Sequence, residues 1–248
     1  MVPEAELNES MAEEIATQKK TEAPAPQPIR ARFYKIGMLQ YISHLDLVRT
    51  MTRIITRAGI PAWYTQGFNP RLKLTFAMPL SIGTQSECEF FDIKLVGPMA
   101  PDEVKARLNE CLTSEMQITD VYTSDRKFSE IAWARYEIRL TSPSFNPEDA
   151  RKLTELYTNP LVVMKRSKAG DHEADISPFV RLDSVTFGDG SLIVKTLLSA
   201  DNATYVNPEH LVRKAEECLG TTFEDPFTEF YTIVRKEVYL SDGKTIFR

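Results

Sequence analysis

The sequence has few cysteines and no long apolar segment. Its three cysteines, Cys88, Cys111 and Cys218, are far apart and odd in number, which argues against a disulfide framework and indicates a reducing compartment. No run of about twenty apolar residues is present, so no transmembrane helix is predicted. The first residues are acidic and polar, unlike the apolar core of a secretory signal. We therefore expect a cytoplasmic protein that does not contact a membrane.

Motifs for metals and nucleotide cofactors are also missing. The three histidines, His44, His172 and His210, are scattered, and no CxxC pair occurs, which excludes the usual cysteine spacing of an iron–sulfur cluster. The glycine-rich signatures of P-loops and dinucleotide-binding folds are absent. The GxSxG nucleophile elbow is absent as well. We expect neither a metal nor a bound cofactor.

Charge is distributed unevenly along the chain, although the net charge of −5 alone argues weakly against nucleic-acid binding. Residues 1–29 hold six acidic residues and two lysines. Residues 30–73 hold one acid, Asp46, and eight bases, which are Arg30, Arg32, Lys35, Arg49, Arg53, Arg57, Arg71 and Lys73. A locally basic region of this kind is typical of a surface that binds a polyanion. A solvated helix face with surface lysines would give the same pattern.

Composition and hydrophobic patterning divide the chain into three parts. Residues 1–29 are rich in Glu, Ala, Pro and Gln, which predicts a disordered acidic tail. In residues 30–124, the patterns predict a helix at 44–58, a helix at 102–111, and strands at 32–39, 61–65, 73–78, 87–96 and 117–123. Residues 73–78 and then 87–96 are predicted to form a strand or a long hairpin arm, and the resulting order is the β-α-β-β-α-β of a ferredoxin-like unit.

A similar order follows in residues 134–248. Helices are predicted at 147–157 and 208–219, and strands at 135–141, 161–165, 181–187, 191–198 and 229–239, with a hairpin turn at Gly188-Asp189-Gly190. The predicted fold class is therefore α+β, with two tandem ferredoxin-like units after the tail. The two units are expected to meet near residues 124–134.

The predicted helix at 44–58 has one apolar face and one basic face. Arg49, Arg53 and Arg57 are spaced four residues apart and form a basic stripe. Ser43 is a favourable N-cap, and Asp46 lies three residues later as in a capping box. Free backbone N–H groups and the helix dipole make an uncovered helix N-terminus a natural site for an anion. His44 at this start is a candidate phosphate donor or general base, although a first-turn histidine can also be purely structural.

A polar loop follows this helix. It contains Gln66, Asn69 and Arg71, with Phe68 available for stacking and Lys73 adding charge. The same residues would also suit a turn in which Asn69-Pro70 fixes the backbone. We expect the loop and the helix start to reach the same edge of the sheet. The predicted anion- or substrate-binding residues are His44, Arg49, Arg53, Gln66, Phe68, Asn69, Arg71 and Lys73.

Several runs resemble a known bacterial family. They are Tyr41-Ile-Ser-His-Leu-Asp-Leu, Arg57-Ala-Gly, Gln66-Gly-Phe-Asn-Pro, Phe76-Ala-Met-Pro-Leu-Ser-Ile-Gly and Phe91-Asp-Ile-Lys-Leu. In order and spacing they are similar to the radical-SAM-linked family of bacterial proteins. Its members occur alone or joined to the C-terminal end of a radical SAM protein with a cobalamin-binding-type domain. The resemblance covers residues 30–200 and implies a radical SAM protein as partner; it does not imply an activity.

Three functions are compatible with these features. The first is a non-catalytic accessory protein that binds RNA, or another anionic substrate, for a partner radical SAM enzyme. The second is an RNA-processing, endonuclease-like enzyme in which His44 is the general base and Arg71 or Lys73 stabilises the transition state. The third is a protein–protein adaptor that binds no nucleic acid. No catalytic residue other than His44 is predicted.

Overall fold

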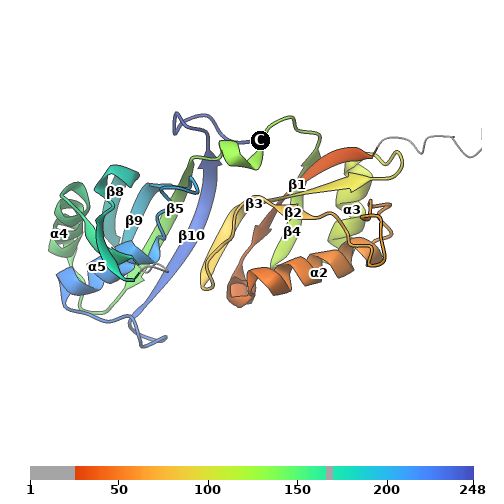
Figure 1. Ribbon diagram of the computed structural model, residues 1–248. Coiled ribbons are helices and arrows are strands. Elements are labelled where there is room, and N and C mark those ends of the chain that lie inside the picture. Colours follow the sequence, from red (N-terminus) through yellow and green to blue (C-terminus); the bar gives the residue numbers. More distant parts are fainter. Residues whose placement is uncertain (1–25, 166–169) are drawn as a thin grey trace, which may run out of the picture.

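The computed structural model describes residues 26–165 and 170–248, so the predicted tail lies, up to residue 25, outside the described residues (Figure 1). Within these ranges, eight strands form one mixed sheet, four α-helices pack against it, and two more strands form a small separate sheet. The predicted α+β class is confirmed. No helix in the described part of the chain is long and apolar enough to cross a membrane.

The first half carries the strand order β4-β1-β3, with β2 paired to β3. Its elements are β1 (Gln27–Lys35), the short 3-10 helix η1 (Gly37–Tyr41), α2 (His44–Arg57), β2 (Thr75–Phe76), β3 (Thr84–Leu95), α3 (Pro101–Cys111) and β4 (Met116–Tyr122). All strand pairs within this half are antiparallel. The apolar faces of α2 and α3 cover β1, β3 and β4, and the buried side chains include Leu47, Met51, Ile55, Val104 and Leu108.

The second half carries the strand order β10-β5-β9-β8, again antiparallel throughout. Its elements are η2 (Phe128–Glu130), β5 (Trp133–Thr141), α4 (Pro147–Thr158), β6 (Val162–Lys165), β7 (His172–Asp175), η3 (Ser177–Phe179), β8 (Val180–Gly188), β9 (Ser191–Ser199), α5 (Glu209–Leu219) and β10 (Phe230–Tyr239). Helices α4 and α5 form the second core with β5 and β9, through residues that include Leu153, Tyr157, Leu211 and Val212.

A single parallel pairing joins the two halves into one sheet. Thr84, Gln85 and Ser86 at the start of β3 pair with residues 233–235 of β10. Farther along the same edge, β3 pairs instead with the two-residue strand β2. The shortness of β2 therefore leaves the first part of the β3 edge free for β10. The expected meeting point near residues 124–134 is a linker that contains η2, and the main contact between the halves is this seam.

A buried ion pair lies at the seam. The Arg235 guanidinium on β10 donates to a Glu89 carboxylate oxygen on β3 at 2.8 Å, to the Tyr136 hydroxyl at 3.1 Å and to the Pro79 carbonyl at 3.2 Å. Both charged side chains are buried, with 1% and 4% of their surface exposed. Burial lowers the pKa of the nearby Lys35, and the negative charge of Glu89 partly opposes this shift. The ion pair connects side chains from β3, β5 and β10.

The start of the fold differs from the prediction. Strand β1 begins at Gln27, inside the segment predicted to be a tail, because Gln27 and Pro28 pair with the end of β3 and Ile29 is buried in the first core. The predicted strand at 32–39 also ends early. Gly37 has a φ of +60°, which turns the chain into η1. Deleting residues 1–29 would therefore remove part of a central strand.

Two other predicted strands are changed. Residues 61–65 make only isolated bridges, from Ala62 to Leu95 and from Tyr64 to Leu72, and the predicted strand at 73–78 shrinks to β2. The predicted strand at 161–165 forms as β6, but it pairs with β7 outside the large sheet. Its place in the sheet is taken by β8, which pairs along its whole length with β9. Local strand patterns do not specify which partner a strand will find.

We predict that Arg235→Met destabilises the protein by about 3–5 kcal/mol, because it leaves the Glu89 carboxylate buried without its partner. The measurement is urea-induced unfolding followed by circular dichroism. The neighbouring substitution Lys236→Met is the matched control. Lys236 forms a solvent-exposed ion pair with Glu87, so its loss should cost about 0–1 kcal/mol. Equal, small effects of the two substitutions would contradict a structural role of the buried pair.

Candidate functional site

The start of α2 is closed by its own side chains. Ser43 Oγ accepts a hydrogen bond from the Asp46 backbone N–H at 3.1 Å and donates to an Asp46 carboxylate oxygen at 2.7 Å. Arg49 pairs with the same carboxylate at 3.2 Å. The Ser43 hydrogen bond and then the Arg49 contact hold the pKa of Asp46 below its usual range. A carboxylate thus already occupies the positive end of the helix, which argues against the predicted use of this terminus for an external anion.

The eight bases of residues 30–73 divide into two groups of four. The first group is engaged within the fold: Arg30 pairs with Asp92, Arg32 with Glu237 and Arg49 with Asp46, and Lys35 donates to the Leu39 carbonyl. The second group is exposed and, within the described residues, its side chains make neither ion pairs nor hydrogen bonds. These four bases are Arg53, Arg57, Arg71 and Lys73. The second group is free to bind a ligand, and Arg49, which is 60% exposed in a surface ion pair, can exchange its partner at little cost.

The polar loop is anchored beside the C-terminal half of α2. It is closed by backbone hydrogen bonding from Thr65 to Arg71 at 2.8 Å, and the Thr65 hydroxyl accepts from the Arg71 N–H at 3.0 Å. The Tyr64 hydroxyl lies 3.2 Å from the Thr56 hydroxyl in the last turn of α2. Phe68 at the tip of the loop is fully exposed, and Gln66 and Asn69 are exposed as well. We call this surface the loop face; it comprises Arg53, Arg57, Tyr64, Gln66, Phe68, Asn69, Arg71 and Lys73.

His44 lies at the other end of the helix. Its ring packs edge-on against Phe76 of β2, with the ring centres 5.7 Å apart. Helix α2 has 14 residues, so its two ends are separated by roughly 20 Å. The orange segment that follows α2 in Figure 1 leaves from the end opposite His44. The length of α2 therefore places His44 and the tip of the loop at opposite ends of the helix, which does not favour the predicted common edge.

A cluster of exposed apolar side chains surrounds the start of α2, and the sequence patterns did not identify it. Met38, Tyr41, Leu45 and Ile82 each expose more than half of their surface. The Gly83 N–H donates to the Gln40 carbonyl at 2.9 Å and holds the two contributing segments together. We call these four residues the apolar patch. Exposed apolar side chains gathered at one end of a helix are a candidate interaction site.

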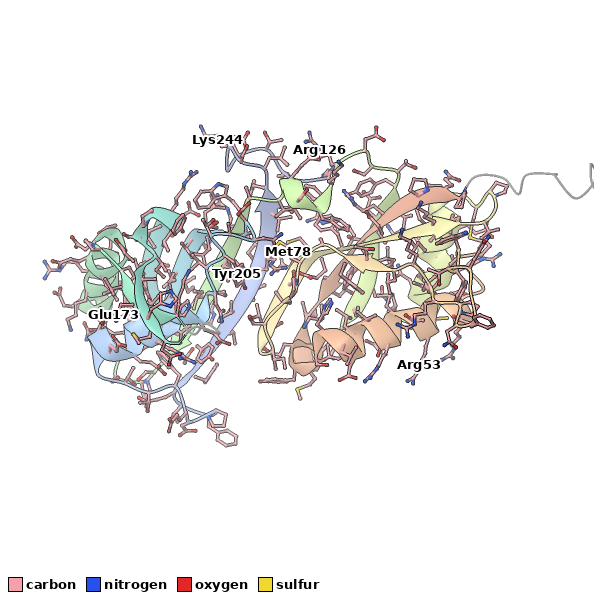
Figure 2. All side chains as sticks on the ribbon, in the orientation of Figure 1. Arg53, Met78, Arg126, Glu173, Tyr205 and Lys244 are labelled. Carbon is pink, nitrogen blue, oxygen red and sulfur yellow. The ribbon has the colours of Figure 1, made fainter. Side chains whose placement is uncertain are left out.

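A cavity of about 350 Å³ lies where the two halves meet. Residues 78–81 line it from the first half, and Ala200, Asn202 and Tyr205 line it from the second. Figure 2 shows the labelled Met78 and Tyr205 on opposite sides of the junction. Pro79 connects the cavity to the buried ion pair, since its carbonyl accepts from Arg235. Residues 78–81 belong to the run Phe76-Ala-Met-Pro-Leu-Ser-Ile-Gly, which carries part of the family resemblance. None of its residue types indicates a chemical role, so the sequence did not predict this cavity.

A second cavity of about 340 Å³ adjoins the first at Tyr205. Its lining includes three nitrogen bases, Lys165 from β6 and His210 and Arg213 from α5. Burial lowers the pKa of His210, and the positive charges of Lys165 and Arg213 lower it further. No group of three or more His, Cys, Asp or Glu side chains within the described ranges is arranged to hold a metal ion.

Comparison with known proteins places the chain in a family. Residues 28–208, well over half of the sequence, match a family described as "Uncharacterized protein conserved in bacteria (DUF2344)". The chain belongs to this family. The DUF2344 match spans the first half, the seam strand β3 and the β8–β9 hairpin. It therefore includes the loop face, the apolar patch and the lining of the central cavity. No curated protein matches the chain.

Similarity of this DUF2344 protein to solved structures is weak. An unknown protein from Galdieria sulphuraria is 11% identical, with 84% of this chain and 96% of that chain covered, at a TM-score of 0.26. DyPB from Rhodococcus jostii RHA1 is 10% identical, with 88% and 95% covered, at a TM-score of 0.20. Scores this low carry no argument about fold or function.

We predict that Arg213→Ala raises the pKa of His210, because it removes one of the positive charges that disfavour protonation of the imidazole. The measurement is a pH titration of the His210 ring signals by NMR. Lys244→Ala removes a charge from a distant exposed position (Figure 2) and should leave the His210 pKa unchanged. If Arg213→Ala leaves the His210 titration unaltered, the charge of Arg213 does not act on the His210 ring as described above.

Proposed function

We propose that this protein is a non-catalytic accessory protein that binds RNA, or a similar anionic substrate, for a partner radical SAM enzyme. The single observation that carries the proposal is the loop face. There, four exposed bases without intramolecular partners among the described residues lie on the loop and on the second half of α2, and the ring of Phe68 at the loop tip is fully exposed. Free bases bind phosphates, and an exposed aromatic ring can stack on an unpaired nucleotide base. The radical SAM partner rests on the family resemblance alone.

The position of His44 favours binding over catalysis. A general base and the cation that stabilises the transition state must both reach one reacting group, within a few ångströms. His44 lies at one end of α2, whereas Arg71 lies near the other end, in the loop tied to Thr56 through Tyr64. The alternative, an endonuclease with His44 as base and Arg71 as stabiliser, would require these groups to come together across the length of the helix. Lys73, by contrast, lies three residues before Phe76, the ring that packs against His44.

We further propose that each half is a ferredoxin-like unit. In the first half the strand order β4-β1-β3-β2 follows the fourth, first, third and second strands of the chain, and β10-β5-β9-β8 does the same in the second half. The hairpin β6–β7 is then an insertion between α4 and β8. Sheets of this topology often bind RNA, but this is only an analogy and adds little to the argument from the loop face.

The apolar patch supports the part of the proposal that concerns the partner protein. Met38, Tyr41, Leu45 and Ile82 lie at the end of α2 away from the loop, so a protein bound there would leave the loop face open. Tyr and Met side chains such as Tyr41 and Met38 are enriched where proteins bury surface against a partner. We propose that the radical SAM protein docks on the apolar patch while the substrate binds the loop face.

We predict that RNA binding weakens steeply with salt, because phosphate contacts release counterions. The double substitution Arg71→Ala, Lys73→Ala should lower the slope of log affinity against log salt by about two, roughly one for each lost contact. Phe68→Ala should weaken binding by about 1–3 kcal/mol without changing the slope. The measurement is fluorescence anisotropy with a pool of single-stranded RNA at several salt concentrations.

The double substitution Arg151→Ala, Lys244→Ala removes the same charge from exposed positions of the second half and serves as the control, with an unchanged slope expected. An absence of binding to any RNA at low salt would overturn the nucleic-acid proposal and leave the adaptor. RNA cleavage that falls by about 10²–10⁴-fold in His44→Ala would instead support the endonuclease.

We predict that Leu45→Glu combined with Ile82→Glu abolishes copurification with the radical SAM protein, because two buried carboxylates would be unpaired in the interface. RNA binding should be unchanged, since the substitutions are far from the loop face. Phe227→Glu alters another exposed apolar side chain and is the control. Unchanged copurification of the double variant would place the partner elsewhere.

A further inference from the structure

The two adjoining cavities differ in chemistry. The cavity of about 350 Å³ is mainly apolar, with Met78, Pro79, Leu80 and Ala200 among its lining residues. The cavity of about 340 Å³ is polar and contains the three nitrogen bases together with Met164, Tyr205, Asn207 and Glu209. Tyr205 lines both, and its carbonyl accepts a hydrogen bond from Lys165 Nζ at 3.5 Å. A basic group is thus held beside the residue that the two cavities share.

We propose that the two cavities form one binding site for a small organic phosphate, such as a nucleoside monophosphate. The apolar or aromatic part of the ligand lies between residues 78–81 and Tyr205. Its phosphate lies among Lys165, His210 and Arg213. This site is separate from the loop face and does not rest on the function proposed above.

The polar cavity is suited to phosphate because its bases come from two directions. Lys165 extends from β6, while His210 and Arg213 are three residues apart and therefore share one face of α5. Arg213 is exposed and has no ion-pair partner in the described part of the chain. Glu209 contributes one negative charge, and Asn207 Nδ2 contacts its carboxylate at 3.4 Å. The bases outnumber this acid, and Arg213 can form two parallel hydrogen bonds to a phosphate.

The apolar cavity has room for a ring. Small-molecule sites are mostly apolar, with a few convergent polar groups that fix orientation. Here Ser81 and Asn202 are the polar side chains of the apolar cavity, and the phenol of Tyr205 offers a face for stacking. The Arg235 ion pair fixes the Pro79 backbone at its floor. The cavity is therefore built on the seam between the halves rather than on a single loop.

The test is calorimetric titration of the full chain with adenosine monophosphate, uridine monophosphate and phenyl phosphate. Adenosine and inorganic phosphate are titrated separately as the two parts of the ligand. We expect at least one monophosphate to bind with a Kd below about 1 mM and about tenfold more tightly than either part. Arg213→Ala should weaken monophosphate binding about tenfold and leave adenosine binding unchanged, because it removes a charge-assisted contact to the phosphate alone.

Asn202→Trp tests the apolar cavity from an exposed position, where a larger side chain can fill the space without disturbing the core. It should weaken binding of both adenosine and the monophosphates. Arg71→Ala with Lys73→Ala is the control for the loop face and should leave monophosphate binding unchanged. RNA binding, in turn, should be unaffected by Arg213→Ala, so the two proposals fail independently.

The proposal is overturned if none of the three monophosphates binds below about 1 mM. It is also overturned if Arg213→Ala, with a melting temperature equal to that of the wild type, leaves their binding unchanged. If inorganic phosphate binds as tightly as every monophosphate, the apolar cavity does not contribute to binding. That result would overturn the assignment to an organic phosphate. A shift of the His210 ring signals on addition of monophosphate to the wild type, and its loss in Arg213→Ala, would support the assigned position.

Discussion

The buried ion pair between Arg235 and Glu89 is the most deeply buried charged contact that the described residues make between the two halves, and it supports their arrangement together with Phe90 of β3, which packs in the second core against Phe247. The ion pair lies beside a seam of only three paired residues on each strand. So short a parallel pairing fixes the relative position of two large units weakly unless side chains support it. Arg235 adds hydrogen bonds to Tyr136 and to the Pro79 carbonyl. Because a buried charge without its partner is costly, alternative registers of the seam are disfavoured.

This constraint also determines where cavities form. Tyr136 belongs to the second core, Glu89 to the seam strand β3, and Pro79 to the segment that leads into β3. Holding these together brings residues 78–81 opposite Ala200 and Tyr205. The central cavity therefore exists only because the halves are joined, and its lining comes from residues more than one hundred positions apart. The polar cavity of about 340 Å³ lies next to it and shares Tyr205 with it.

Helix α2 separates the surfaces on which the proposed function rests. Its length places the apolar patch and His44 at one end and the loop face near the other. The separation suits a protein that binds two partners at once, because neither would cover the other's surface. Asp46 neutralises the positive helix end near the apolar patch, whereas the unpaired bases lie along and beyond the second half of the helix. Within the described residues, the bases left without partners are thus those that form no ion pair or hydrogen bond in the fold.

Much of the architecture could be predicted from local patterns. Residues a few positions apart specify the amphipathic spacing of α2, its Ser43 cap and the turn at Gly188-Asp189-Gly190. They also specify α3 and α5, the last helix of each half. The β6–β7 hairpin and the short β2 could not be predicted in this way. Both depend on competition between strands for an edge, and this competition involves residues distant in the sequence.

For the candidate site, the sequence by itself determined the composition: a polar loop with Phe68 and Arg71, a basic helix stripe, and a capped helix start. Only the tertiary structure decided which bases are free, because Arg30, Arg32 and Lys35 find partners from other strands and from η1. It also decided that His44 and the loop tip lie at opposite ends of α2, and that Tyr205 borders both the cavity between the halves and the cavity lined by His210 and Arg213. Spacing along the chain specifies a helix face, but proximity across a sheet depends on pairing and packing over long range.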